Sequence, residues 1–225
     1  MAERTRLRRR RKVAVTIELV ALAIDSNYEP VTEAACDFRN EHVYPALTAR
    51  GFVLEKLQGP LARRFYVAPA AARPEIDYIT GVGHGVYDTF TGHHGDVIFR
   101  AGAFQAAEVS GKIVHLLSCQ TARELGPSFI RNGCAAFFGY DENFTFLFDF
   151  AERFFACDAE IDLAFAEGLT AKKVYARVRA LFEKQIAELL AAGHVYVAAT
   201  LRFDLDHLRS PVDGRSWGSV RAKLR

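Results

Sequence analysis

Two short stretches place a histidine and a cysteine in matching positions. "DYITGVGHGV" carries His84 between two glycines just past an apolar run, and "KIVHLLSCQTA" carries Cys119 just past another. The thiolate is the reactive form of cysteine, and a nearby imidazole can generate or stabilise it. If the two runs are neighbouring parallel strands, their carboxyl ends meet at the sheet edge where open α/β sheets bind ligands. The pair therefore predicts nucleophilic chemistry.

The residues around this pair fit the same chemistry. Gly83 and Gly85 allow the backbone to approach a substrate closely. The backbone N–H of Cys119, with one near Gly85, would form an oxyanion hole. A different interpretation stays open for each residue alone, since a cysteine after an apolar strand is often a small buried hydrophobe and His84 could be a turn residue.

The elements that would position these residues follow from the apolar pattern. Apolar runs alternate with amphipathic segments, which predicts a mostly parallel sheet covered by helices on both faces, a three-layer α/β/α sandwich. We expect a polar loop at 86–102, a late strand at 194–205, and a strand or extended wall at 143–150, where phenylalanine recurs at period two. The expected strands are 13–24, 52–57, 76–81, 112–118 and 135–140, and the expected helices are 29–51, 103–111, 122–133, 151–168 and 171–193.

Length and charge indicate one domain behind a basic arm. The 225 residues, half of them hydrophobic, suffice for a single well-buried domain at 13–225. The arm, residues 1–12, holds seven of the 29 lysines and arginines, so the remaining chain carries 22 basic against 26 acidic residues. A nucleic-acid-binding domain would carry its positive charge on the folded face, so we expect no nucleic-acid partner. Transient contact of the arm with an acidic partner stays open.

Other features bear on membranes, compartment and metals. Glu18 interrupts the first apolar run, no cleavage site follows it, and no stretch reaches the ~18–20 apolar residues that span a bilayer. The four cysteines lack paired metal spacing and do not form a disulfide framework, which predicts a reducing cytoplasm. The run His93-His94-Gly95-Asp96 has no further ligand spaced to complete a site. We therefore expect no metal and no cofactor.

The combination "ITGVGHG" followed by "HLLSCQTA" resembles the caspase-like cysteine peptidases, the group of caspases, gingipains, clostripain, separase and the bacterial CHAT proteases. The resemblance covers residues 13–205 and implies a third strand ending at a catalytic histidine and a fourth ending at the nucleophile, which match His84 and Cys119. "NGCAAFFGY" is similar to the fifth strand of the gingipain and CHAT branches. The short gap from Cys119 to Ala135 departs from caspases proper, which carry a long processed linker there.

The residues that would select a substrate are less sharply marked. A pocket for arginine or lysine needs a carboxylate, and in arginine-directed relatives an acidic residue before the histidine lines it. Asp25 ends the first strand and is the first candidate, although a helix cap or turn role is equally compatible with its position. Asp141 and Glu142 follow the fifth strand, and Tyr140 lies beside them, with Phe144, Phe146 and Trp217 as further aromatic candidates for a groove.

Taken together, these patterns predict a caspase-like cysteine endopeptidase that cleaves after a basic residue. Cys119 would attack the scissile carbonyl of a protein or peptide substrate, and His84 would protonate the leaving amine. Activation by a regulatory protein stays open. One alternative is a non-catalytic caspase-like scaffold or partner-binding domain. Another is a flavodoxin-like ligand binder, which "AIDSNYEP" disfavours because it lacks a glycine-rich phosphate loop.

Overall fold

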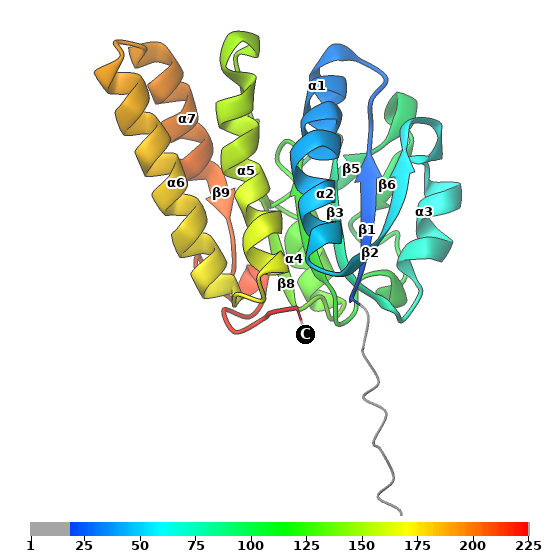
Figure 1. Cartoon of the computed structure of the whole chain (residues 1–225). Coiled ribbons are helices and arrows are strands. Elements are labelled where there is room, and N and C mark those ends of the chain that lie inside the picture. The colour runs from blue at the N-terminus through cyan, green and yellow to red at the C-terminus, as the bar shows by residue number, and fades with distance from the viewer. Residues whose placement is uncertain (1–18, 225) are drawn as a thin grey trace, which may run out of the picture.

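The computed structural model describes residues 19–224, so the basic arm and the start of the first expected strand lie outside the described residues. A six-stranded sheet with the order β2-β1-β3-β7-β8-β9 forms its centre (Figure 1). The first five of these strands are parallel, and β9 runs antiparallel to β8 at the edge. Their bounds are β1 (Leu19–Asp25), β2 (Phe52–Gln58), β3 (Ile76–Val82), β7 (Ile113–Leu117), β8 (Ala136–Tyr140) and β9 (Leu208–Arg209).

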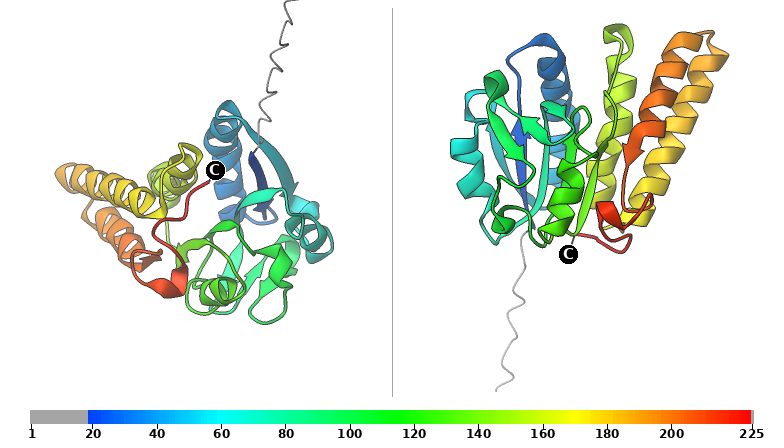
Figure 2. Two further views of the ribbon diagram at one scale, coloured as in Figure 1. Left: turned by 90° about the horizontal axis from the view of Figure 1, so that it is seen from below. Right: turned by 180° about the vertical axis from the view of Figure 1, so that it is seen from behind.

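Both faces of this sheet are covered, because successive residues of its strands point to opposite sides. In β1, Ala21 and Ala23 belong to one buried cluster, whereas Leu22 and Ile24 belong to another. The first cluster includes α1 (Pro30–Phe38), η1 (Arg39–Val43), α2 (Tyr44–Ala49), α5 (Ala151–Ala166), α6 (Ala171–Ala191) and α7 (Val195–His207). The second includes α3 (Arg64–Ala71) and α4 (Leu125–Arg131), which Figure 2 shows from behind. The expected α/β/α fold class is confirmed.

A small antiparallel sheet replaces the polar loop expected at 86–102. It consists of β4 (His84–Val86), β5 (Thr89–Thr91) and β6 (Val97–Arg100). Phe90, Ile98 and Phe99 are buried in the second cluster, and their burial fastens this segment to the central sheet. The remaining short helical turns are η2 (Gly59–Leu61), η3 (His93–Gly95), η4 (Ala106–Glu108), η5 (Phe148–Phe150) and η6 (Arg215–Trp217).

One expectation for the second half of the chain was wrong, and another is decided between its two alternatives. The strand expected at 194–205 is helix α7, because Val197, Leu201 and Leu205 recur at helical spacing and are buried with α5 and α6 in the first cluster. Of the strand or extended wall expected at 143–150, the structure has the latter, an extended loop that ends in η5. The expected long helix does begin after Thr170 as α6, with Gly193 at φ +81° just beyond it.

No membrane-crossing helix is found among residues 19–224, since none of their helices is both long and apolar enough.

Candidate active site

The structure brings His84 and Cys119 to the same edge of the central sheet. Strands β3 and β7 are adjacent and parallel, with Val82 opposite Leu117, so both residues stand two positions past a paired strand end. The N–H of Gly83 donates to the carbonyl of Leu117 at 3.3 Å, which continues the pairing toward the site. Both His84 and Cys119 line one cavity of about 50 Å³. The expected juxtaposition is thus a feature of the fold.

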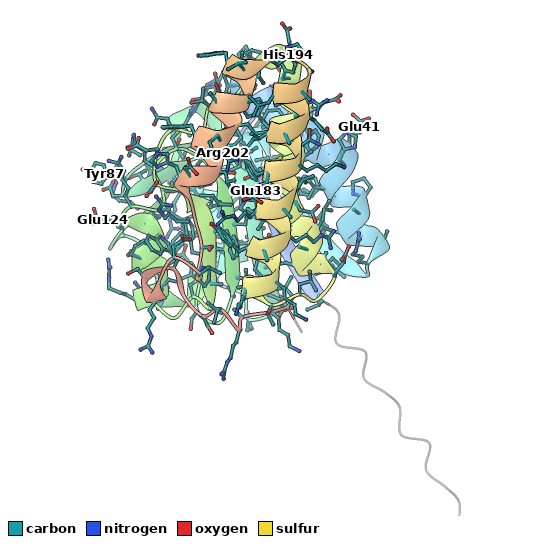
Figure 3. All side chains as sticks on the ribbon, turned by 90° about the vertical axis from the view of Figure 1, so that its left-hand side faces the viewer. Glu41, Tyr87, Glu124, Glu183, His194 and Arg202 are labelled. Carbon is teal, nitrogen blue, oxygen red and sulfur yellow. The ribbon has the colours of Figure 1, made fainter. Side chains whose placement is uncertain are left out.

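Two further contacts fasten the loop of His84 to the loop of Cys119. Gly85 approaches so closely that a Cβ built on it would lie 2.3 Å from the carbonyl oxygen of Cys119. The carbonyl of Tyr87 accepts hydrogen bonds from the N–H groups of Glu124 and Leu125, at 2.9 and 3.1 Å. Figure 3 shows Tyr87 and Glu124 next to each other on one side of the molecule. The β4–β5 turn is therefore tied to the segment that follows the cysteine.

A carboxylate lies beside the histidine, and sequence reasoning missed it. Oε1 of Glu29 lies 3.0 Å from Nε2 of His84. The same oxygen accepts the N–H of Thr32 at 3.1 Å, because Glu29 is the N-cap of α1. Tyr28 adds an edge contact to the imidazole, with ring centroids 6.1 Å apart. The only signal was a Glu-Pro pair opening a helix after β1, on the edge that also carries His84.

Cys119 occupies a half-buried position at a strained point of the backbone. Burial raises the pKa of its thiol, and a hydrogen bond from the Phe144 N–H partly opposes that rise. Gln120 follows with φ +58°, in the left-handed region that few non-glycine residues adopt. Helix α4 begins only at Leu125, so its start is not adjacent to the sulfur. The start of α4 therefore does not stabilise the thiolate, and a base must take the proton of the thiol.

Apart from His84, Cys119 and the hydroxyl residues Thr32 and Ser118, the walls of the cavity are apolar. Val31 and Ala35 of α1 form one side, and Phe144, Phe146 and Phe155 form another. The rings of Phe146 and Phe155 lie 4.7 Å apart between centroids. Of the aromatic residues considered for a groove, Phe144 and Phe146 are thus at the site. The indole N–H of Trp217 instead donates to the carbonyl of Ala122.

The placement of Asp25 corrects the expectation that it holds a basic substrate side chain. Its side chain is fully buried and is not part of the cavity wall. One carboxylate oxygen accepts the Val82 N–H and lies 3.4 Å from the guanidinium of Arg39, and the other accepts from Gln58 and Tyr44. Burial raises its pKa against the lowering effect of Arg39. Asp25 is a structural carboxylate.

The three other specificity candidates also lie away from the cavity wall. Tyr140 is fully buried, and its hydroxyl donates to Asp158 at 3.0 Å, so it belongs to the core. The carboxylate of Asp141 lies 2.8 Å from Nδ1 of His207 and is also an ion-pair partner of Arg209. Glu142 pairs with Arg123. The structure thus gives both acidic side chains partners within the chain and places them outside the cavity wall.

A buried polar network lies on the α5 side of the sheet. His115 of β7 is fully buried, with Asp158 and Asp162 at 3.1 and 3.2 Å from its ring nitrogens. Burial lowers the pKa of His115, but the two carboxylates outweigh it and raise it to about 9. Asp162 also receives Arg39 at 3.1 Å. The carboxylate of Asp162 is thus shared by Arg39 and His115, and that of Asp158 contacts His115.

Asp204 of α7 holds the loop that forms the aromatic wall. It is fully buried and its Oδ1 accepts the Thr145 N–H at 3.1 Å, between Phe144 and Phe146. Its other oxygen, equally buried, has no partner among the described residues. Burial raises the pKa of Asp204 to about 8, so the carboxyl carries a proton at neutral pH.

The histidine pair upstream of β6 lies near Tyr28. The centroids of the His93 and His94 rings are 5.8 and 4.9 Å from that of the tyrosine. Within the part of the chain that the structure describes, no group of three or more histidine, cysteine, aspartate or glutamate side chains is placed to hold a metal ion.

Comparison of the sequence with protein-family models found no match, and comparison with curated proteins found none either. The chemistry assigned to His84 and Cys119 therefore depends on the geometry of the site.

Proposed function

We propose that the protein is a cysteine endopeptidase in which Cys119 is the nucleophile and His84 the general acid and base. The observation that carries this proposal is the shared cavity at the ends of β3 and β7, lined by an imidazole and a thiol from adjacent strands. The resemblance of "ITGVGHG" and "HLLSCQTA" to caspase-like peptidases assigns the same roles to the same two residues.

The reaction proceeds in two balanced halves. His84 takes the proton of the Cys119 thiol, the sulfur attacks the scissile carbonyl carbon, and the carbonyl electron pair moves to oxygen. The N–H of Cys119, with one near Gly85, donates to this oxyanion. Collapse breaks the C–N bond while the imidazolium gives its proton to the departing amine, which leaves a thioester. Water then attacks as His84 removes its proton, the C–S bond breaks, and the sulfur recovers the proton.

Glu29 acts on this cycle through the histidine. Because burial disfavours the thiolate, the imidazolium–thiolate pair requires support from a nearby negative charge. The Glu29 carboxylate, 3.0 Å from Nε2, supplies it and also orients the ring. Glu29 is thus a positioning residue, since it acts on the substrate only through His84. The substrate is a protein or peptide, and the four free thiols fit a reducing compartment such as the cytoplasm.

Alkylation of the four cysteines provides a direct test. In the folded protein near neutral pH, Cys119 should react with iodoacetamide at least about tenfold faster than the others, because thiolate content governs the rate. Burial raises the pKa of Cys36 and of Cys134 to about 12 and that of Cys157 further still. The measurement is a time course of adducts mapped by mass spectrometry.

Two variants connect this reactivity with turnover. Cys119→Ala should abolish cleavage of a peptide library and keep the circular dichroism spectrum. His84→Ala should do nearly the same, with the half-exposed His42 replaced by alanine as the matched control. Cleavage that persists at the wild-type rate in Cys119→Ala would reject the proposal. A wild-type protein that cleaves no peptide, with Cys119 no faster than Cys36, would favour a non-catalytic partner-binding domain instead.

A further inference from the structure

The cavity beside Cys119 has a chemical character that bears on which substrates it accepts. Its walls include two aliphatic residues of α1 and the rings of Phe144, Phe146 and Phe155. Among the described residues that line it, the ionisable ones are His84 and Cys119 themselves. A charged substrate side chain placed there would lose its hydration and gain no counter-ion, which is strongly unfavourable.

The cavity is also small. Its volume is about 50 Å³, whereas one water molecule needs about 10–15 Å³ of such space and an apolar cavity that binds benzene measures about 150 Å³. A methyl or a short branched group therefore fits without movement of the walls. A leucine, arginine or phenylalanine side chain does not.

The aromatic wall is held from both sides. The N–H of Thr145, which lies between Phe144 and Phe146, donates to the buried Asp204 of α7. The Phe146 ring packs on Phe155 of α5. Because the loop is tied to α7 through Asp204 and to α5 through Phe155, the size of the cavity is a property of the fold.

We propose that this cavity binds the side chain of the substrate residue whose carbonyl is attacked, and that it selects a small apolar side chain such as alanine or valine. The inference rests on the proposed peptidase function, and it replaces the cleavage after basic residues that the sequence predicted. Phe146 is the residue that sets the upper limit of size, since its ring forms part of the wall between the loop and Phe155.

Peptidyl chloromethyl ketones that differ only in the residue next to the reactive carbon test this directly. The second-order rate of Cys119 modification would be measured by intact mass for Ala, Val, Leu, Arg and Asp versions. One methylene too many in an apolar pocket costs about 10- to 200-fold, so the alanine reagent should exceed the leucine reagent by at least about tenfold. The arginine and aspartate reagents should be slower by about 100-fold or more, because each would bury an unpaired charge.

A pair of phenylalanine variants locates the effect. Phe146→Ala enlarges the cavity and should raise the leucine-to-alanine rate ratio by about tenfold or more. Phe148→Ala is the control, because this ring is 60 % exposed and is not part of the cavity wall. Its rate ratios should equal those of the wild type.

The outcomes separate this inference from the proposed function. Suppose that Cys119 reacts selectively with iodoacetamide but fastest with the arginine, aspartate or leucine reagent. That result would overturn the small apolar pocket and leave the proposed peptidase function intact. Equal rates for all five reagents, or a leucine-to-alanine ratio that Phe148→Ala changes as much as Phe146→Ala, would overturn it too. A Cys119 without selective reactivity toward iodoacetamide would remove the peptidase, and the pocket with it.

Discussion

Asp204 offers a prediction that can be worked from the structure, because its protonation couples to folding. In the folded protein its pKa is raised to about 8, whereas 3.8 is the ordinary value for an aspartate. Between these two values the folded protein binds one proton more than the unfolded chain. The free energy of unfolding therefore falls as pH rises through this window, by about 1.36 kcal/mol per pH unit.

The perturbation is Asp204→Asn, which keeps the shape of the protonated carboxyl and an oxygen for the Thr145 N–H. The variant lacks the titrating group. Its free energy of unfolding, compared with that of the wild type, should therefore rise by about 2.7 kcal/mol from pH 5 to pH 7. For a domain of this size that corresponds to about 5–11 °C in Tm. His115, whose pKa is raised to about 9, contributes stability that is complete below about pH 6.5 and lost as pH rises through 9. Because both proteins contain His115, its contribution cancels in the difference between their free energies of unfolding.

The assay is urea unfolding at pH 5, 6 and 7, followed by circular dichroism. Any pH-independent cost of the asparagine drops out, because only the change of the difference with pH is compared. Asp206→Asn on the same helix is the control, since Asp206 is exposed, and its curve should run parallel to that of the wild type. Parallel curves for Asp204→Asn as well would refute the reasoning and show that Asp204 is ionised when folded.

The remaining predictions concern the geometry around Cys119. Gly85→Ala should lower kcat/KM for a cleaved peptide by about 100-fold. Its Cβ would lie 2.3 Å from the Cys119 carbonyl oxygen and would displace the two loops by about an ångström. Val86→Ala, at the exposed neighbouring residue, is the control and should leave kcat/KM unchanged. Glu29→Gln keeps the cap but loses the charge beside His84, so kcat/KM should fall about tenfold, or about 1.4 kcal/mol. An unchanged kcat/KM would make Glu29 a helix cap alone, and Glu33→Gln is the exposed control.

The sequence predicts the backbone of the site better than its side-chain partners. Apolar runs ending before His84 and Cys119, with one crossover between them, suffice to place both at one sheet edge, because consecutive parallel strands are usually adjacent. The segment that became α7 was mistaken for a strand, since "HVYVAATL" is rich in β-branched and aromatic residues. Val197, Leu201 and Leu205 do recur at helical spacing, but the β-branched and aromatic residues around them outweighed that signal until the packing of α7 on the first cluster was known.

Side-chain partners distant in sequence were the least accessible. A carboxylate at the end of a strand looks the same whether its partner is a substrate or an arginine of the chain. Asp25 is held by Arg39 and Gln58, which come from η1 and the end of β2, and only the folded arrangement shows that they meet. Glu29 has the opposite ambiguity, because its capping role is visible locally and its contact with His84 is not.

The pairing of charges explains why an acidic pocket does not form at this site. Asp25 already faces Arg39, which also holds Asp162 at 3.1 Å and donates to Thr80. An arginine of a substrate would have to displace this internal guanidinium, and breaking a buried ion pair costs about 3–5 kcal/mol. That is more than a charge-assisted contact of about 1.5–3 kcal/mol could return. The cavity beside the thiol and the imidazole is lined mostly by aliphatic and aromatic side chains, and the selection by size proposed above depends on that surface.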